Sequence, residues 1–414
     1  MRSSTARSVA AVASMLAAAA CGGDLVVSAV AERCEASDIG GTIQLTIPNP
    51  DWNARSRPSD GRLALRIGTV HLDSGEMFDL ITSVDADSKR RIYVADSRLH
   101  QVAVFDSTGS PIRRLGRQGE GPGEFQGLLT LRVVLGDSLR VFDQRLWRET
   151  VYDSAGQLVG TTSPVLGPNY GQFPEVRFDP RGGLLNLGFE KFRESLLEDL
   201  GSRISGVVRA LNTVSRWDRE AKAWEAIRDV PSVEVFFAAG GLRDIPFGRS
   251  PLWSPAPDGG FWYADSGEYT LERVGADGRI TCRLMVEHKL RPASDTERRD
   301  FRTAADVSEA SEERIRRIRA NRAELPIPER VPALRRLLVG GDGAVWVQPT
   351  GEYRGPRLTP ERVIWHVYEP DGRPRGRVAL PGVFIPNSVV GSLIYGRERD
   401  ELNVQYASVY EVDL

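Results

Sequence analysis

Short runs of alternating apolar and polar residues, separated by turn residues, recur along this chain. The first clear group contains three such runs, at residues 91–96, 101–106 and 111–116. Runs of this length, bounded by Gly, Pro, Asp and Ser, are typical of antiparallel strands joined by tight turns. The pattern predicts a meander of β-strands.

The same pattern returns at a regular spacing. An Asp precedes a Gly by thirteen residues at three places, Asp96 with Gly109, Asp143 with Gly156 and Asp265 with Gly278. Weaker copies extend the equivalent positions to 96, 143, 188, 265, 349 and 397, so the steps are 47, 45, 77, 84 and 48 residues. A period in the forties with four strands per unit is typical of propeller blades. The sequence therefore predicts an all-β, six-bladed β-propeller with four-stranded antiparallel blades.

The last unit is one strand short. Asp413 aligns with Asp106, so the chain ends before a fourth strand. Residues 42–47 and 63–68 both read as strands, and the second run resembles the strand at 111–116. We expect an N-terminal strand to close the last blade, because closure removes an exposed sheet edge.

The first residues are typical of an export signal. Arg2 and Arg7 precede a short apolar stretch at residues 9–20, which is too short to span a bilayer, and Cys21 follows a run of Ala. This predicts a lipoprotein signal peptide over residues 1–20, lipidation of Cys21, a flexible tether over residues 21–40 and the propeller over residues 41–414. The alternative is an ordinary secretory signal cut nearby. We expect the protein in the bacterial cell envelope, anchored by lipid at the outer membrane or the periplasmic face.

Composition narrows the choice of partners. The formal net charge of −2 argues against a nucleic-acid partner, since such proteins usually carry a basic surplus. We expect a monomer without a cofactor. In an oxidising compartment, Cys34 and Cys282 form a candidate disulfide; the alternative is two isolated thiols.

The run from residue 114 to 125, which ends in Gly-Pro-Gly-Glu-Phe, follows the strands of the first unit. With those strands it resembles the six-bladed β-propeller lipoproteins related to NHL-repeat proteins. The resemblance implies a fold and supplies little mechanism.

Candidate binding residues gather at one end of the predicted blades. In a four-stranded blade, the turn after the second strand and the link to the next blade lie on the same face. Three insertions, at residues 189–212, 231–251 and 291–332, fall there, and loops on a rigid scaffold often carry function.

Several acidic residues belong to this face. Asp96, Asp143 and Asp265 could form a ring of carboxylates for a cation or a polar ligand, or each could accept main-chain N–H groups in its own turn. Pro122 and Gly123 predict a type II turn in the link at 119–125, with Glu120 and Glu124 available to a ligand.

Residues 295–325 read as the helical part of the chain, with Asp306 or Ser308 as cap. Its arginines, Arg316 and Arg319 among them, could contact an acidic glycan or a lipid headgroup, or form a solvated basic face. Nearby aromatic residues could stack on a sugar or peptide, or pack in the core; they are Phe236, Phe237, Trp253 and Tyr353.

Two classes of function remain open. The first is a non-catalytic binding or scaffold module for a protein, peptide or saccharide. The second is an exported metal-dependent hydrolase or lyase, with a metal on the propeller axis. The four histidines, His71, His100, His288 and His366, show no ligand spacing. Converging Asp, Glu, Asn or His side chains at the axis would favour the enzyme, and an apolar or Arg-lined axis would favour the binding module.

Overall fold

The computed structural model describes residues 43–47, 57–69, 77–164, 175–189, 191–201, 205–238, 241–308, 310–351 and 360–414. The predicted signal peptide and tether, with Cys21 and Cys34, lie outside these residues. No helix among the described residues is long and apolar enough to cross a membrane.

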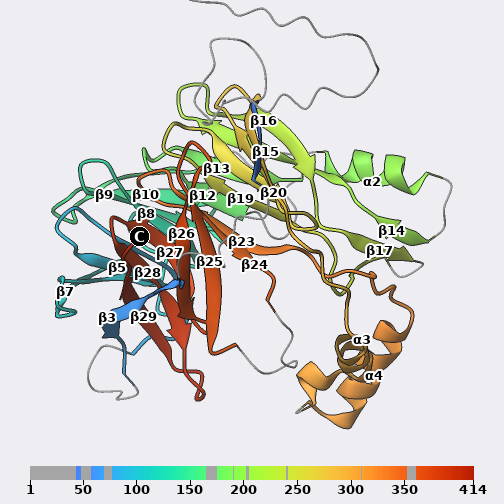
Figure 1. Cartoon of the computed structure of the whole chain (residues 1–414). Coiled ribbons are helices and arrows are strands. Elements are labelled where there is room, and N and C mark those ends of the chain that lie inside the picture. Colours follow the sequence, from blue (N-terminus) through green and yellow to red (C-terminus); the bar gives the residue numbers. More distant parts are fainter. Residues whose placement is uncertain are drawn as a thin grey trace, which may run out of the picture. The chain divides into compact units, whose positions relative to one another are not determined.

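The described strands form seven sheets, of which six are blades that follow one another in chain order and one is a small inserted sheet. Figure 1 shows the blades in the colours of the chain. Blade 1 contains β4 (Ile81–Ala86), β5 (Ile92–Asp96), β6 (Gln101–Phe105) and β7 (Pro111–Leu115). Blade 2 contains β8 (Leu128–Val134), β9 (Ser138–Asp143), β10 (Arg148–Tyr152) and β11 (Leu158–Thr162). Blade 3 contains β12 (Glu175–Phe178), β13 (Leu184–Gly188), β15 (Leu211–Asp218) and β16 (Ala223–Pro231).

The other three blades follow the same order. Blade 4 contains β19 (Pro251–Pro255), β20 (Phe261–Asp265), β21 (Thr270–Val274) and β22 (Ile280–Val286). Blade 5 contains β23 (Leu334–Val339), β24 (Val345–Pro349), β25 (Arg362–Tyr368) and β26 (Pro374–Pro381). Blade 6 contains β27 (Ile385–Val390), β28 (Leu393–Arg399) and β29 (Gln405–Glu411).

The first strands of the blades contact one another in a closed series. β4 contacts β8, and the series continues through β12, β19, β23 and β27 back to β4. Six apolar clusters lie between successive blades, including the one that joins blade 6 to blade 1. Because side chains alternate across a strand, a blade between two neighbours is buried on both faces, and β5 and β13 are buried throughout. The predicted six-bladed β-propeller is confirmed.

The N-terminal segment lies along the outer strands of three blades. β3 (Arg62–Ile67) pairs antiparallel with β29 and supplies the fourth strand of blade 6, as predicted. β1 (Ile43–Ile47) pairs parallel with β22, and β2 (Ser59–Asp60) pairs parallel with β26. Blades 4 and 5 therefore have five strands, a departure from the predicted four. Alternation along 42–47 indicated a strand, but it carried no information about its partner.

The insertions have secondary structure of their own (Figure 1). α2 (Phe192–Leu200) lies beside a small sheet of β14 (Gly206–Val208), β17 (Val235–Ala238) and β18 (Gly241–Asp244). This helix was not predicted.

The predicted helical region is two helices, α3 (Asp295–Thr303) and α4 (Glu312–Ala323), with a short 3-10 turn, η2 (Ala305–Val307), between them. Ser294 and Ser311 cap the two α-helices through their side chains. The predicted caps were wrong: Asp306 lies within η2 and Ser308 follows it. Ala304, in the left-handed conformation, ends α3 and is the residue after which η2 begins.

Candidate functional site

The strand order places all three insertions at one end of the blades, which we call the insertion-bearing face. Residues 189–212 follow β13, residues 231–251 link β16 to β19, and residues 291–332 link β22 to β23. Second strands end and first strands begin at this face in every blade.

Asp96 and Asp143 end β5 and β9, and both are fully buried. The Asp96 carboxylate accepts four main-chain N–H groups, from Asp79, Leu80, Arg98 and Leu99. The Asp143 carboxylate does the same with Gln126, Gly127, Arg145 and Leu146. Each carboxylate thus joins the start of a first strand to the turn after a second strand, which is the turn-forming alternative.

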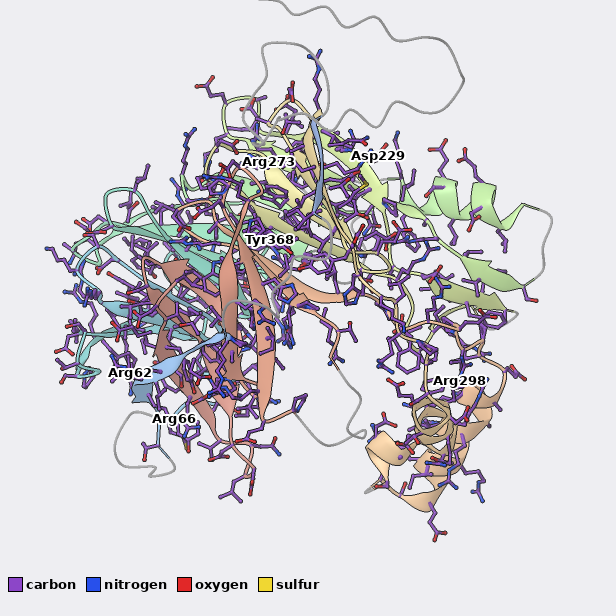
Figure 2. The ribbon with its side chains drawn as sticks, in the orientation of Figure 1. Arg62, Arg66, Asp229, Arg273, Arg298 and Tyr368 are labelled. Carbon is purple, nitrogen blue, oxygen red and sulfur yellow. The ribbon has the colours of Figure 1, made fainter. Side chains whose placement is uncertain are left out.

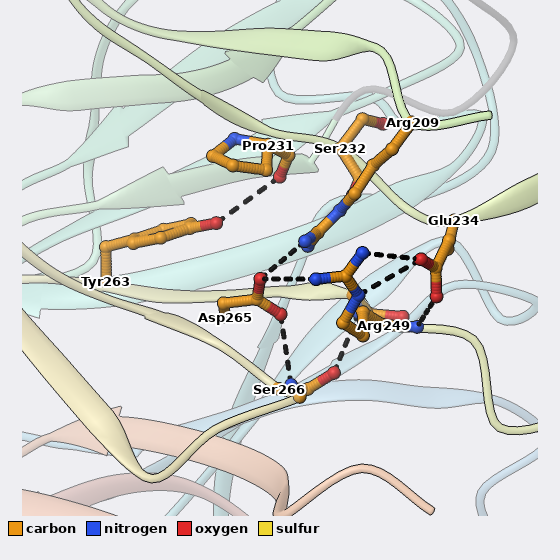
Figure 3. Close-up of polar contacts among 10 residues, drawn as sticks. Arg209, Pro231, Ser232, Glu234, Arg249, Tyr263, Asp265 and Ser266 are labelled. Atoms are coloured by element: carbon orange, nitrogen blue, oxygen red, sulfur yellow. Dashed lines mark hydrogen bonds and ion pairs between the residues drawn. The ribbon is translucent and has the colours of Figure 1, made fainter. Parts of the chain in front are cut away.

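Asp265 ends β20 but makes different contacts (Figure 3). Its carboxylate pairs with Arg209, which follows β14, and lies 3.9 Å from Nη1 of Arg249. Nη2 of Arg249 lies 2.7 Å from Oε1 of Glu234. Residues from two insertions and one blade therefore meet in a network of two arginines and two carboxylates.

A serine takes over part of this role in blade 4. Oγ of Ser266 accepts the main-chain N–H of Ser250, just before the first strand, at 2.7 Å, while the Asp265 carboxylate keeps one turn bond, from the N–H of Gly267 at 3.0 Å, and also pairs with Arg209. Burial tends to raise the pKa of Asp265, but hydrogen bonds and charge from Arg209 and Arg249 outweigh it, and the pKa lies below its usual value. The balanced charges indicate that this network attaches the insertions to blade 4.

The insertions also contact one another. Leu200, Val208 and Val235 form a small buried cluster between α2 and the inserted sheet. Nη1 of Arg243 on β18 lies 3.5 Å from Oε2 of Glu324, directly after α4. Of the aromatic candidates, Trp253 is buried in the core between blades 3 and 4, Phe236 and Phe237 are half-buried on β17, and Tyr353 lies outside the described residues.

Helix α4 presents most of its arginines to solvent. None of its residues is buried, and the exposed arginines are Arg314, Arg316, Arg317 and Arg319. Nε of Arg319 donates to the carbonyl of Thr303 at 2.9 Å, and Arg322 pairs with Asp306. Arg316 makes no hydrogen bond or ion pair with the described residues, so its charge is available to a partner.

The link at 119–125 stabilises itself. Glu124 N–H donates to the carbonyl of Gly121 at 3.0 Å, and Gly123 has φ of +77°, as the predicted turn requires. The Glu124 carboxylate accepts the N–H of Gly121 at 2.8 Å and pairs with Arg117, and these hydrogen bonds lower its pKa. Of the two candidate glutamates, Glu124 is therefore engaged within the loop, whereas Glu120 is exposed.

Two arginines near the first strands were not selected from the sequence. Arg397 stands in blade 6 where blades 1 and 2 have Asp, and its Nη1 donates to the carbonyl of Ile81 at 3.0 Å. Arg336 on β23 donates from Nη1 to Oε1 of Gln348 at 2.9 Å. Neither arginine pairs with a carboxylate among the described residues. The signal available in the sequence was Arg397 at the repeat position that holds Asp in blades 1, 2 and 4.

Two histidines that are far apart in the sequence meet at one tyrosine. The hydroxyl of Tyr269 lies 2.8 Å from Nδ1 of His366, and the Tyr269 ring contacts His288 edge-on at 5.7 Å. Burial, with the charges of Arg377 and His288, lowers the pKa of His366 to about 4. No group of three His, Cys, Asp or Glu side chains among the described residues is arranged to hold a metal ion. His71 lies outside them.

Cys282 on β22 is fully buried and disulfide-bonded. Its predicted partner, Cys34, lies outside the described residues, so the pairing of these two cysteines stays a prediction.

Comparison with known proteins supports the fold. Residues 78–162, which span blades 1 and 2, match the model of the DUF5128 family, described as a 6-bladed beta-propeller. No curated protein matches the chain. Together with the six-bladed ring, this match confirms the predicted resemblance to six-bladed propellers.

Solved structures similar to this chain are distant in sequence. A member of the DUF4221 family from Bacteroides vulgatus ATCC 8482 is 10% identical with a TM-score of 0.50, covering 86% of this chain and 99% of that chain. A candidate exported protein from Bacteroides fragilis NCTC 9343 is 11% identical with a TM-score of 0.44, and the match covers 90% of this chain and 100% of that chain. Virginiamycin B lyase from Staphylococcus aureus is 9% identical with a TM-score of 0.38, covering 84% and 99%. At such identities the likeness concerns the fold alone.

Proposed function

We propose that this protein is an exported, lipid-anchored binding module that presents its insertion-bearing face to a protein, peptide or saccharide. The observation that carries the proposal is the construction of that face. Segments from two insertions combine into one small sheet, and the network around Asp265 attaches that sheet to blade 4. A preorganised surface on a rigid scaffold is suited to binding, because little ordering is needed when a partner arrives.

Helix α4 supplies the charge for this role. The C-terminal end of this helix is joined to the inserted sheet by the ion pair between Glu324 and Arg243, and the exposed arginines lie along the helix before that end. A partner with acidic groups would gain both contact area and charge-assisted hydrogen bonds there.

The test is a charge reversal that leaves the fold intact. We expect the triple variant Arg314→Glu, Arg316→Glu, Arg317→Glu to melt like the wild type, since these side chains are exposed. In a screen of immobilised peptides and glycans, its binding should fall at least about tenfold for acidic ligands. The matched control is Arg113→Glu, Arg114→Glu on β7, an exposed pair on an outer strand. Equal binding by wild type and triple variant, or an equal loss in the control, would refute the proposed face.

The anchor has its own test. Cys21→Ser should release the protein from the membrane fraction. Burial of a lipid chain in the bilayer contributes about 0.8 kcal/mol of binding free energy per methylene, and the variant lacks the chain. A variant that stays in the membrane pellet at high salt would contradict the lipoprotein assignment, with the wild type in the same fractionation as reference.

A further inference from the structure

Arg336 and Arg397 come from neighbouring blades and approach the same part of the insertion-bearing face. Arg336 lies near the start of β23, and β23 contacts β27. Arg397 lies opposite Ile385, the first residue of β27, in the register of blade 6. The strand β27 therefore adjoins both strands that carry these arginines, and the two positive charges lie close enough to repel each other.

These guanidinium groups are held in place by uncharged partners. Gln348 accepts from Arg336, and main-chain carbonyls of Ile81 and Thr82 accept from Arg397. Such contacts orient each side chain and leave its positive charge uncompensated. Glu398, the nearest acidic residue along the strand, points to the opposite face of β28 and pairs with Arg66.

Burial and mutual repulsion both act on this pair. Arg336 and Arg397 are half-buried, while their neighbours Arg335 and Arg399 are exposed. Burial lowers the pKa of Arg397, and the charges of Arg399 and Arg336 lower it further. Half-buried like charges without a counter-ion favour an anion that enters between them.

An unsatisfied acceptor lies on β27, which contacts β23 and pairs with β28. The strand β27 is irregular between Pro386 and Ser388, so Asn387 is an extra residue next to the pair of Pro386 with Gly396. Its Oδ1 is buried and has no hydrogen-bond partner among the described residues. Buried polar atoms are nearly always paired, so this oxygen lacks a donor that a ligand could supply.

We propose that Arg336, Arg397 and Asn387 form a subsite for a carboxylate of an acidic peptide. The arginines would bind the carboxylate, and Oδ1 of Asn387 would accept a main-chain N–H of the same peptide. A peptide carries a carboxylate and an N–H a few ångströms apart, which fits donors and acceptor together. This inference rests on the proposed binding function and names the chemistry of its ligand.

The probe is a fluorescently labelled tetraglutamate peptide, with an amidated tetraglutamine peptide as its neutral match. Binding to the full mature protein is measured by fluorescence anisotropy at low and high salt. We expect the wild type to bind tetraglutamate more tightly than tetraglutamine, with a difference that shrinks at high salt.

Variants then locate the site. Arg336→Gln should weaken tetraglutamate binding at least about tenfold, because charge-assisted hydrogen bonds are lost. Asn387→Asp should weaken it as well, since it adds a repelling charge. The matched control is Arg145→Gln, an exposed arginine after β9 on the same face with the same change in charge, which should have less than about a twofold effect.

Three results would overturn the inference: unchanged affinity in Arg336→Gln, equal binding of both peptides, or binding of a uronic-acid oligosaccharide without binding of tetraglutamate. Arg397→Gln is avoided because Arg397 also holds the main chain of blade 1. Loss in Arg336→Gln with full binding by the α4 triple variant would keep the subsite and refute the role of the insertions. The reverse pattern would keep the proposed function and refute the subsite.

Discussion

Arg66 and Arg62 on the closing strand β3 provide a matched pair for testing how blade 6 is held (Figure 2). Nε of Arg66 lies 2.7 Å from Oε1 of Glu398, whose side chain is only 3% exposed. The Arg66 guanidinium also lies 4.0 Å from the ring centroid of Tyr406. Arg62 pairs instead with Glu411, and both side chains of that pair are exposed, at 73% and 36%. Substituting Ala for Arg66 or for Arg62 therefore removes an ion pair in both cases, and the two cases differ mainly in how deeply the partner carboxylate is buried.

The magnitudes follow from that difference. Removing one partner of a buried ion pair costs about 3–5 kcal/mol. The Arg66 side chain is 40% exposed, so water can enter and reduce the loss for Arg66→Ala to about 2 kcal/mol. Arg62→Ala should cost less than about 1 kcal/mol, as exposed pairs do.

The assay is urea unfolding, monitored by tryptophan fluorescence. The urea concentration at the midpoint is compared between variants whose dependence of unfolding free energy on urea has the same slope. A second substitution isolates the pair. Glu398→Gln should destabilise the wild type. In the Arg66→Ala background Glu398 keeps its hydrogen bonds from Ser408 and Tyr410 but has lost its counter-ion, so Glu398→Gln removes an uncompensated buried charge and should restore about 1 kcal/mol. The reasoning would be refuted if Arg66→Ala cost no more than Arg62→Ala, or if Glu398→Gln had the same effect in both backgrounds.

Three further predictions use the same unfolding measurement. Gly116→Ala should cost more than about 2 kcal/mol, because φ is +85° and a Cβ would lie 2.3 Å from the Phe125 ring. Its control, Gly136→Ala, has φ of +80° but open space around the Cβ and should cost about 1 kcal/mol. Equal losses in the two variants would contradict this reasoning. The pKa of His366 is lowered from 6.5 to about 4, so the unfolded chain binds the proton more readily than the folded protein. The free energy of unfolding should therefore have its full value above pH 6.5 and fall by about 3 kcal/mol as the pH drops to 4. His366→Phe should flatten that dependence. Cys282→Ser should cost about 2–4 kcal/mol, and a reductant should destabilise the wild type but not the variant; a wild type insensitive to the reductant would speak against the disulfide.

The sequence alone determined the repeat and its local chemistry. The spacing of Asp96, Asp143 and Asp265 fixed the blade period, and Pro122 with Gly123 fixed one turn. The resemblance between residues 63–68 and the strand at 111–116 identified the closing strand. These features are readable because alternation, turn residues and repeat length act over a few neighbouring residues.

Only the tertiary structure decided how distant segments combine. Residues 42–47 read as a strand, yet its parallel pairing with β22 depends on the ring that brings those segments together. Asp265 shares its repeat position with Asp96, but the insertions place Arg209 beside it, and Ser266 takes over the bond to the start of the first strand. Arg336 and Arg397 are sixty-one residues apart and became one candidate site because neighbouring blades present their first strands at the same axis. Such contacts arise from packing across the ring, which no local pattern in the sequence encodes.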